Sequence, residues 1–201
     1  YAVYESKGDL QTTDFERYAD AHWSVVKYAQ WMEQHALTLN PGATGCSGTV
    51  TSSDPNLPPW ERVNWSQLNM CEEIIGRIAS TGFSHRLPRR PDQQYYELIG
   101  KYEQYNAGWD DSNATPSDYL IALSARFIEY RNMRGKANDL YSVASTASYV
   151  LVANHLFSAL DAALSAAKFN HSVAMEAHLR PVVRSVGIVE FVPTASITLT
   201  F

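Results

Sequence analysis

Cysteine and positive charge are both scarce in this chain of 201 residues, which contains two cysteines and has a formal net charge of −5. Two cysteines cannot form a structural zinc site by themselves, and the sequence has no CxxC redox pair. A net negative charge provides no basic surface for a phosphate backbone, so we predict no nucleic-acid partner. We likewise predict no metal and no other cofactor.

Catalytic motifs are also lacking. The sequence has no GxSxG, no HExxH, no P-loop, no GxGxxG and no Cys-His signature. His155 and Asp161 lie six positions apart in a predicted helix, so their side chains face different directions and cannot form a catalytic dyad there. We therefore assign no catalytic residue, and the sequence favours a protein without enzymatic activity.

The two cysteines, Cys46 and Cys71, lie in a region rich in glycine, serine, proline and asparagine. A disulfide between them would close a loop within residues 37–92, and it would imply an oxidising compartment outside the cytoplasm. We favour this disulfide. The alternative is a pair of free, buried thiols.

What the sequence does contain is a long apolar run at residues 142–170, dense in alanine and serine. The run has no proline or glycine, and its alanine and leucine residues favour an α-helix. Asn154, Ser158 and Asp161 recur at spacings of three or four, so they share one side of this helix. We favour a buried core helix with a hydrogen-bonded polar side, and the alternative is a membrane-spanning helix, for which about 20 residues suffice. We predict that Asn154, His155, Ser158 and Asp161 serve packing or assembly.

Shorter amphipathic patterns predict four further helices, at residues 14–36, 65–80, 93–111 and 116–140. Thr13 or Asp14 is the expected cap of the first of them. After Asn170 the pattern changes to a period of two residues. The predicted fold is therefore mainly α: a helical domain at residues 1–170 around one long central helix, followed by a small C-terminal antiparallel β element at residues 171–201.

In this C-terminal element, Val186 and Ile188, and then Ile197, Leu199 and Phe201, alternate with smaller or polar residues. We favour an internal hairpin that turns at residues 193–194. The alternative is an open strand that pairs with another chain by strand addition. Ile197, Leu199 and Phe201 are the predicted assembly residues of this segment.

A second interpretation of the chain is a small-ligand-binding protein or an enzyme. Its site would be built from Tyr102, Trp109, Asp110 and Arg126, where aromatic and charged side chains occur together. For the neighbouring acids Asp110 and Asp111, however, we favour a capping role at the start of the next helix.

Four segments carry a resemblance to a known family: FERYADAHWSVVKYAQWM, LPRRPDQQYYELIGKYEQYNAGWDD, YRNMRGKANDLY and ANHLFSALDAALSAAKFN. Together they resemble an uncharacterised family of exported envelope proteins of Gram-negative bacteria, known only as a domain of unknown function. The resemblance covers residues 15–170 and the segments occur in the family's order. It implies a periplasmic or cell-surface location and supplies no catalytic residues. The hydrophobic portion that usually precedes the first segment in that family is absent here, so we expect a processed protein or a fragment.

These features together predict a non-enzymatic structural or scaffolding protein of the bacterial envelope. It would act by self-association as a homo-oligomer, or as an accessory subunit of a larger envelope complex. Association with a membrane is a further expectation, which follows from the long apolar run.

Overall fold

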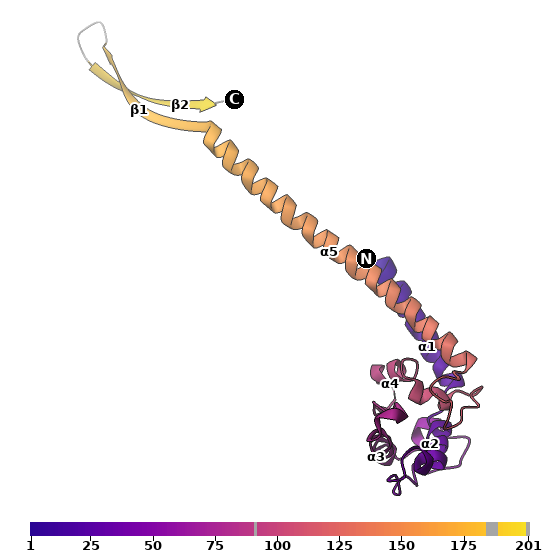
Figure 1. Cartoon of the computed structure of the whole chain (residues 1–201). Helices are drawn as coiled ribbons and strands as arrows, with labels where there is room; N and C mark the ends of the chain where they lie inside the picture. Colours follow the sequence, from indigo (N-terminus) through magenta and orange to yellow (C-terminus); the bar gives the residue numbers. More distant parts are fainter. Residues whose placement is uncertain (91, 184–188, 200–201) are drawn as a thin grey trace. The chain divides into compact units, whose positions relative to one another are not determined.

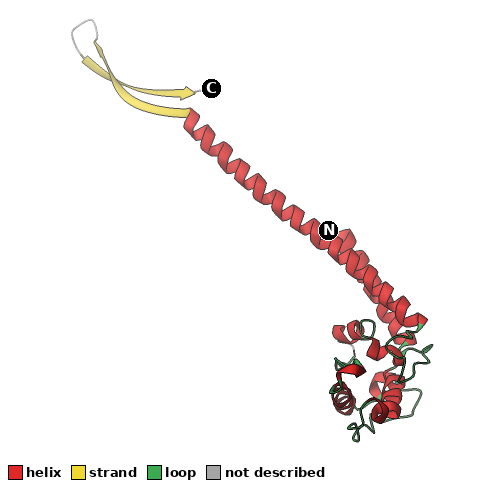
Figure 2. Cartoon of the chain, viewed as in Figure 1, coloured by secondary structure: helices red, strands yellow, loops and turns green. Residues whose placement is uncertain are grey.

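The computed structural model describes residues 1–90, 92–183 and 189–199 and forms two compact units, Tyr1–Ala144 and Ser145–Phe201 (Figure 1). The predicted fold class is confirmed: the described part of the chain is mainly helical, with one long helix and a small antiparallel sheet at its C-terminal end (Figure 2). The expected division after Asn170 follows the change from helix to strand, whereas the two units meet earlier, within the long helix.

The first unit begins with two helices, α1 (Ala2–His22) and α2 (Val25–Leu39), where the sequence pattern predicts one helix at residues 14–36. Trp23 has extended backbone angles, and the Ser24 side chain caps α2 by accepting a hydrogen bond from the Lys27 N–H. The break turns Trp23 into the core, where its indole N–H donates to the Tyr105 carbonyl at 3.0 Å. This packing requires Gly108, because a Cβ there would lie 2.4 Å from the Trp23 ring. The predicted capping position at residues 13–14 is thus wrong, since it lies in the middle of α1.

Short elements complete the first unit. They are the 3-10 helix η1 (Pro59–Glu61), α3 (Trp65–Gly76), η2 (Ala79–Thr81), α4 (Gln93–Leu98) and η3 (Glu103–Gly108). Asn64 and Asp92 cap α3 and α4 by accepting hydrogen bonds from backbone N–H groups of the first turn. The segment between α2 and α3 contains four prolines, which explains why it holds only the short helix η1 before α3 begins at Trp65.

Aromatic side chains form the core of this unit. Among the largest fully buried side chains are Trp109, Tyr28, Tyr105, Tyr130 and Phe127. Trp109 contacts Phe127 edge to face and Tyr130 in a tilted arrangement, with ring centroids 6.4 Å and 5.0 Å apart. Two of these side chains also form hydrogen bonds: the Trp109 indole donates to the Ile99 carbonyl and the Tyr130 hydroxyl to the Tyr96 carbonyl. The core therefore combines large apolar area with specific hydrogen bonds.

The long helix α5 (Ala125–Ser172) contributes its first residues to this core. It starts later than the predicted residue 116, because the Asn106 side chain binds the segment before it: its amide donates to the Tyr119 and Ala122 carbonyls and its oxygen accepts from the Ser124 N–H. Ser124 then caps the helix through the Phe127 N–H. Gly135 does not interrupt α5, which continues without a break to Ser172.

The rest of α5, from Ser145 onward, belongs to the second unit and exposes its apolar side chains. Tyr149 is 74 % exposed, Phe157 72 % and Leu160 57 %. The favoured interpretation of this stretch as a buried core helix is therefore wrong, although the helix itself is confirmed. The apolar run specifies helix formation and low polarity, but it does not specify which surface will cover the helix.

The second unit ends in a hairpin of β1 (Val173–Val183) and β2 (Val189–Leu199). The strands pair antiparallel in one regular register, from Val173 opposite Leu199 to Val183 opposite Val189. The favoured pairing of this strand within its own chain is confirmed, but the predicted hairpin about residues 193–194 is wrong. The residues on both sides of that turn belong to the single strand β2, in which Pro193 lies opposite Leu179, and the partner strand is β1. Val186, Ile188 and Phe201, which the sequence pattern also assigned to strands, lie outside the described residues.

Candidate functional site

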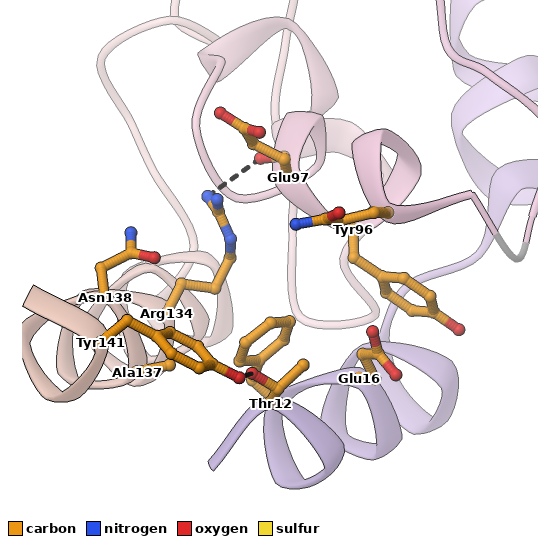
Figure 3. Close-up of a pocket in the computed structure, with 10 residues that line it drawn as sticks. Thr12, Glu16, Tyr96, Glu97, Arg134, Ala137, Asn138 and Tyr141 are labelled. Atoms are coloured by element: carbon orange, nitrogen blue, oxygen red, sulfur yellow. Dashed lines mark hydrogen bonds between the residues drawn. The ribbon is translucent and has the colours of Figure 1, made fainter. Parts of the chain in front are cut away.

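A groove lies between α1, α4 and the first part of α5 in the first unit (Figure 3). Its cavity volume is about 410 Å³. Three helices that are far apart in the sequence form its walls, and their lining residues are Thr12, Phe15, Glu16, Gln93, Tyr96, Glu97, Arg134, Ala137, Asn138 and Tyr141. Sequence reasoning missed this groove, because its residues become neighbours only when the helices pack.

Polar groups on the walls of the groove are partly paired with one another. The Tyr141 hydroxyl donates to Asp9 at 2.7 Å and lies 3.2 Å from the Thr12 hydroxyl, which fixes the ring at one end. Gly8 permits this position, because a Cβ there would lie 2.8 Å from the Tyr141 ring. At the opposite wall, Arg134 donates to the Glu97 carbonyl at 3.0 Å (Figure 3).

Charge in the groove comes mainly from Glu16 and Arg134. Burial raises the pKa of the Glu16 carboxyl above its usual range, and the nearby Asp20 adds to this effect while Arg90 opposes it. The Glu97 carboxylate instead pairs with Lys101 at 3.1 Å. The lining contains one guanidinium, two acids, two amides and three hydroxyls besides the Phe15 ring, and such groups can hold a small polar molecule. They do not form a nucleophile with an adjacent base.

A charged network adjoins this groove at Asp20, Arg90 and Tyr96. Arg90 binds both carboxylate oxygens of Asp20, at 3.0 and 2.6 Å, and the Tyr96 hydroxyl donates to the same carboxylate at 3.0 Å. The Arg90 guanidinium also covers the Trp60 ring at 3.7 Å. These contacts link α1 and α4 to the loop directly before α4, so Arg90 stabilises the walls of the groove.

The residues of the predicted alternative site make separate contacts in the structure. Asp110 and Arg126 form a salt bridge of 2.8 Å, and Trp109, next to Asp110 in the chain, lies fully buried in the aromatic core. Tyr102 stacks on His85, with ring centroids 3.6 Å apart.

The Asp110 carboxylate has a further partner that sequence reasoning missed, since His22 Nδ1 lies 3.0 Å from it and also contacts Arg126. Asp111 accepts a hydrogen bond from the Arg126 N–H in the first turn of α5, which confirms the predicted capping role for this residue. Lys27 donates to the carbonyls of Asp110 and Ser112, at 3.2 and 2.9 Å. This cluster fastens the loop before α5 to α1 and α2.

Glu72 is a buried acid that the sequence analysis did not single out. It is 1 % exposed, and its carboxylate accepts hydrogen bonds from the Tyr28 hydroxyl at 2.9 Å, the Leu87 N–H at 2.8 Å and the Asn69 amide at 3.1 Å. Burial raises its pKa to about 7, although these three donors act in the opposite direction. The Tyr105 hydroxyl is also buried, and it lacks a hydrogen-bond partner within the described part of the chain. A signal was present, because Glu72 falls on the apolar stripe of α3.

The disulfide predicted between Cys46 and Cys71 is not formed: both residues are free thiols in the structure, and both are buried. Burial raises the pKa of each thiol, so the reactive thiolate is disfavoured. Cys71 lies in α3 and Cys46 in the loop that precedes this helix. This corresponds to the alternative of two free, buried cysteines.

The predicted assembly residues of the long helix all lie on its exposed part. Asn154, Ser158 and Asp161 share one side of α5, and His155 lies about 100° around the helix from Asn154. The Ser158 hydroxyl donates to the Asn154 carbonyl at 2.8 Å, and within the described residues the Asp161 carboxylate forms no hydrogen bond or ion pair. In the hairpin, Ile197 and Leu199 lie opposite Met175 and Val173.

A search of the described residues finds no group of three or more His, Cys, Asp or Glu side chains arranged to hold a metal ion. Comparisons with protein-family models, curated proteins and solved structures found no match for the chain. Its function therefore has to be argued from its own residues.

Proposed function

We propose that this protein is a non-enzymatic structural protein of the bacterial envelope, anchored in a membrane by α5 and able to self-associate through the polar side of that helix. The observation that carries the proposal is the exposed apolar part of α5, which has the length and composition of a membrane span. The envelope location rests on the resemblance of four sequence segments to exported envelope proteins. The lack of catalytic motifs in the sequence supports a structural role.

The length of the apolar segment fits a bilayer. Residues 145–167 contain a single charged side chain, Asp161, and Lys168 follows directly. At 1.5 Å per residue, these 23 residues extend about 35 Å, which exceeds the roughly 30 Å of a bilayer's hydrocarbon core. Lys168 can reach the headgroup region from the end of the span.

Exposure of the apolar side chains supports the same assignment. Val150, Leu156 and Phe157 are 65 %, 67 % and 72 % exposed. Removing one such side chain from water stabilises a protein by about 1.5–3 kcal/mol, so a helix that carries many of them is unfavourable in water. Lipid chains would cover this surface without any other protein.

The polar side of the helix supports self-association. A carboxylate near the middle of a span costs about 2.5–3.5 kcal/mol on insertion scales, and such residues commonly face other helices rather than lipid. Asn154, Ser158 and Asp161 form one side, and Ala159 and Ala163 are small residues at a spacing of four. A second copy of the helix would offer the same groups as hydrogen-bond partners.

The anchoring is tested by adding charge to the span. Leu156→Arg together with Leu160→Arg should move the chain from the carbonate-resistant membrane fraction to the soluble fraction or to degradation. The control is Leu10→Arg together with Leu37→Arg, which adds the same charge at exposed leucines of the first unit and should not change fractionation. A wild-type chain that alkaline carbonate extracts would contradict the anchor.

Self-association is tested by chemical crosslinking of the chain in the carbonate-resistant membrane fraction. Asp161→Leu should reduce the amount of crosslinked dimer while the chain stays in the membrane. Asp161→Asn keeps a hydrogen-bonding group and should therefore retain more of the dimer. Equal crosslinking of the wild-type, Asp161→Leu and Asp161→Asn chains would contradict self-association through this side of the helix and would leave the proposed membrane anchor intact.

A further inference from the structure

The hairpin of the second unit separates its residues onto two unlike faces. Residues that lie opposite each other in an antiparallel pair project to the same face, and successive pairs alternate between faces. One face is made by six of the described pairs: Val173–Leu199, Met175–Ile197, Ala177–Ala195, Leu179–Pro193, Pro181–Phe191 and Val183–Val189. Every residue on this face is apolar, and we call it the apolar face of the hairpin.

The other face carries the charged and hydroxyl side chains. It includes Glu176, His178, Arg180 and Glu190, together with Thr194, Ser196 and Thr198. The apolar face is nevertheless open, since Met175 is 74 % exposed, Phe191 62 % and Ile197 61 %. An exposed, continuous apolar surface of this kind marks a site that contacts a protein or a membrane.

The edges of the hairpin are poorly suited to adding another strand. Along an antiparallel pair of strands, hydrogen-bonded positions alternate with non-hydrogen-bonded positions. At a non-hydrogen-bonded position the backbone N–H points to the free edge of the hairpin, so proline, which has no N–H, fits there without breaking a hydrogen bond between the strands. Pro181 in β1 and Pro193 in β2 each remove a donor from one edge. The apolar face, rather than an edge, is therefore the surface that remains to be covered.

We propose that the apolar face of the hairpin lies on the lipid surface where α5 leaves the membrane. This inference rests on the proposed membrane anchor. β1 begins at Val173 directly after α5 ends at Ser172, only five residues beyond Lys168, so the hairpin starts within reach of the headgroup region. An element with one apolar and one charged face is stable there, with the apolar face at the boundary of the acyl chains and the charges in water.

The described charges of the hairpin indicate the kind of lipid contact. Among the residues that the structure describes on this face, Glu176 and Glu190 offset Arg180, so they supply no basic excess that would attract anionic headgroups. The hairpin therefore binds through its apolar face and does so on zwitterionic lipid as well as on anionic lipid. Two copies packed through their apolar faces are the competing arrangement.

An environment-sensitive fluorophore placed on each face tests the proposal in the full chain reconstituted into phosphatidylcholine vesicles. NBD is attached to Ile197→Cys on the apolar face, to its neighbour Thr198→Cys on the other face, and to Leu156→Cys in the span. The native thiols are buried, and labelling of the chain without an introduced cysteine measures their background. Lipids that carry a nitroxide on the acyl chain then report which labels lie against lipid.

The label at Ile197→Cys should emit at shorter wavelength and be quenched several-fold more strongly than the label at Thr198→Cys. Equal quenching at these two positions, with the Leu156→Cys label quenched, would overturn the hairpin proposal alone. A blue-shifted Ile197→Cys label that lipid does not quench, and whose shift grows with protein concentration, would assign the face to a second copy. An unquenched Leu156→Cys label would overturn the anchor and the hairpin proposal with it.

Discussion

The two units of this chain differ in how far they bury their apolar side chains. In the first unit, Phe127 and Trp109 are fully buried, whereas in the second unit Phe157 and Phe191 are 72 % and 62 % exposed. Phe127 and Phe157 even belong to the same helix, α5. The difference shows that the first unit buries its large apolar side chains in a core of its own, while the second unit leaves such side chains exposed.

The largest expected effect contrasts these two phenylalanines. Phe127→Ala should lower the free energy of unfolding of the first unit by about 3–5 kcal/mol, because it removes a fully buried ring. Phe157→Ala should change it by less than about 0.5 kcal/mol. All five tryptophans precede residue 145, so tryptophan fluorescence during urea unfolding of the full chain in detergent reports the first unit. Equal losses of unfolding free energy from the two substitutions would contradict this difference between the two units.

A second prediction concerns pH and Glu72 inside the core of the first unit. The folded protein holds the Glu72 proton up to about pH 7, whereas the unfolded chain releases it near pH 4.5. Stability is therefore highest below pH 4.5 as far as this group is concerned, and it falls by roughly 3 kcal/mol as the pH rises from 4.5 to 7. Glu72→Gln should remove this fall, because the amide does not ionise.

The measurement is the difference in urea unfolding free energy between Glu72→Gln and wild type at several pH values between 4.5 and 8. That difference should shift in favour of the variant as the pH rises. Glu73→Gln is the matched control: it is the next residue of α3, its side chain is 45 % exposed, and it pairs with Arg86. A constant difference across the range would show that the Glu72 carboxyl ionises alike in both states.

The smallest expected effect is that of a reductant. Because Cys46 and Cys71 are free and buried, reduction should leave the unfolding free energy of the first unit unchanged, whereas loss of a disulfide would cost about 2–4 kcal/mol. Both thiols should resist labelling in the native protein and react once it is unfolded in urea without reductant. A chain that gains two reactive thiols only after reduction would contain the disulfide.

Local rules were sufficient for much of this fold. A run without proline or glycine predicted the helix through residues 142–170, a period of two predicted the C-terminal strands, and the pair at Asp110 and Asp111 predicted a cap that Asp111 provides. The helix and the strands depend on residues a few positions apart, whereas the Asp111 cap joins two residues that are 15 positions apart. The break at Trp23 was not predictable in this way, because no proline or glycine marks it and the buried position of the Trp23 ring decides it.

The amino-acid sequence by itself determined the helices, the two-faced strands and the lack of catalytic motifs, since each follows from local propensity or spacing. Only the tertiary structure decided which surfaces of these elements pack together and which stay exposed. It brought Glu16, Tyr96 and Arg134 from three helices to one groove, enclosed Glu72 in the core, and left the second part of α5 uncovered. The physical reason is that propensity and periodicity act over a few residues, whereas burial depends on which distant surfaces meet.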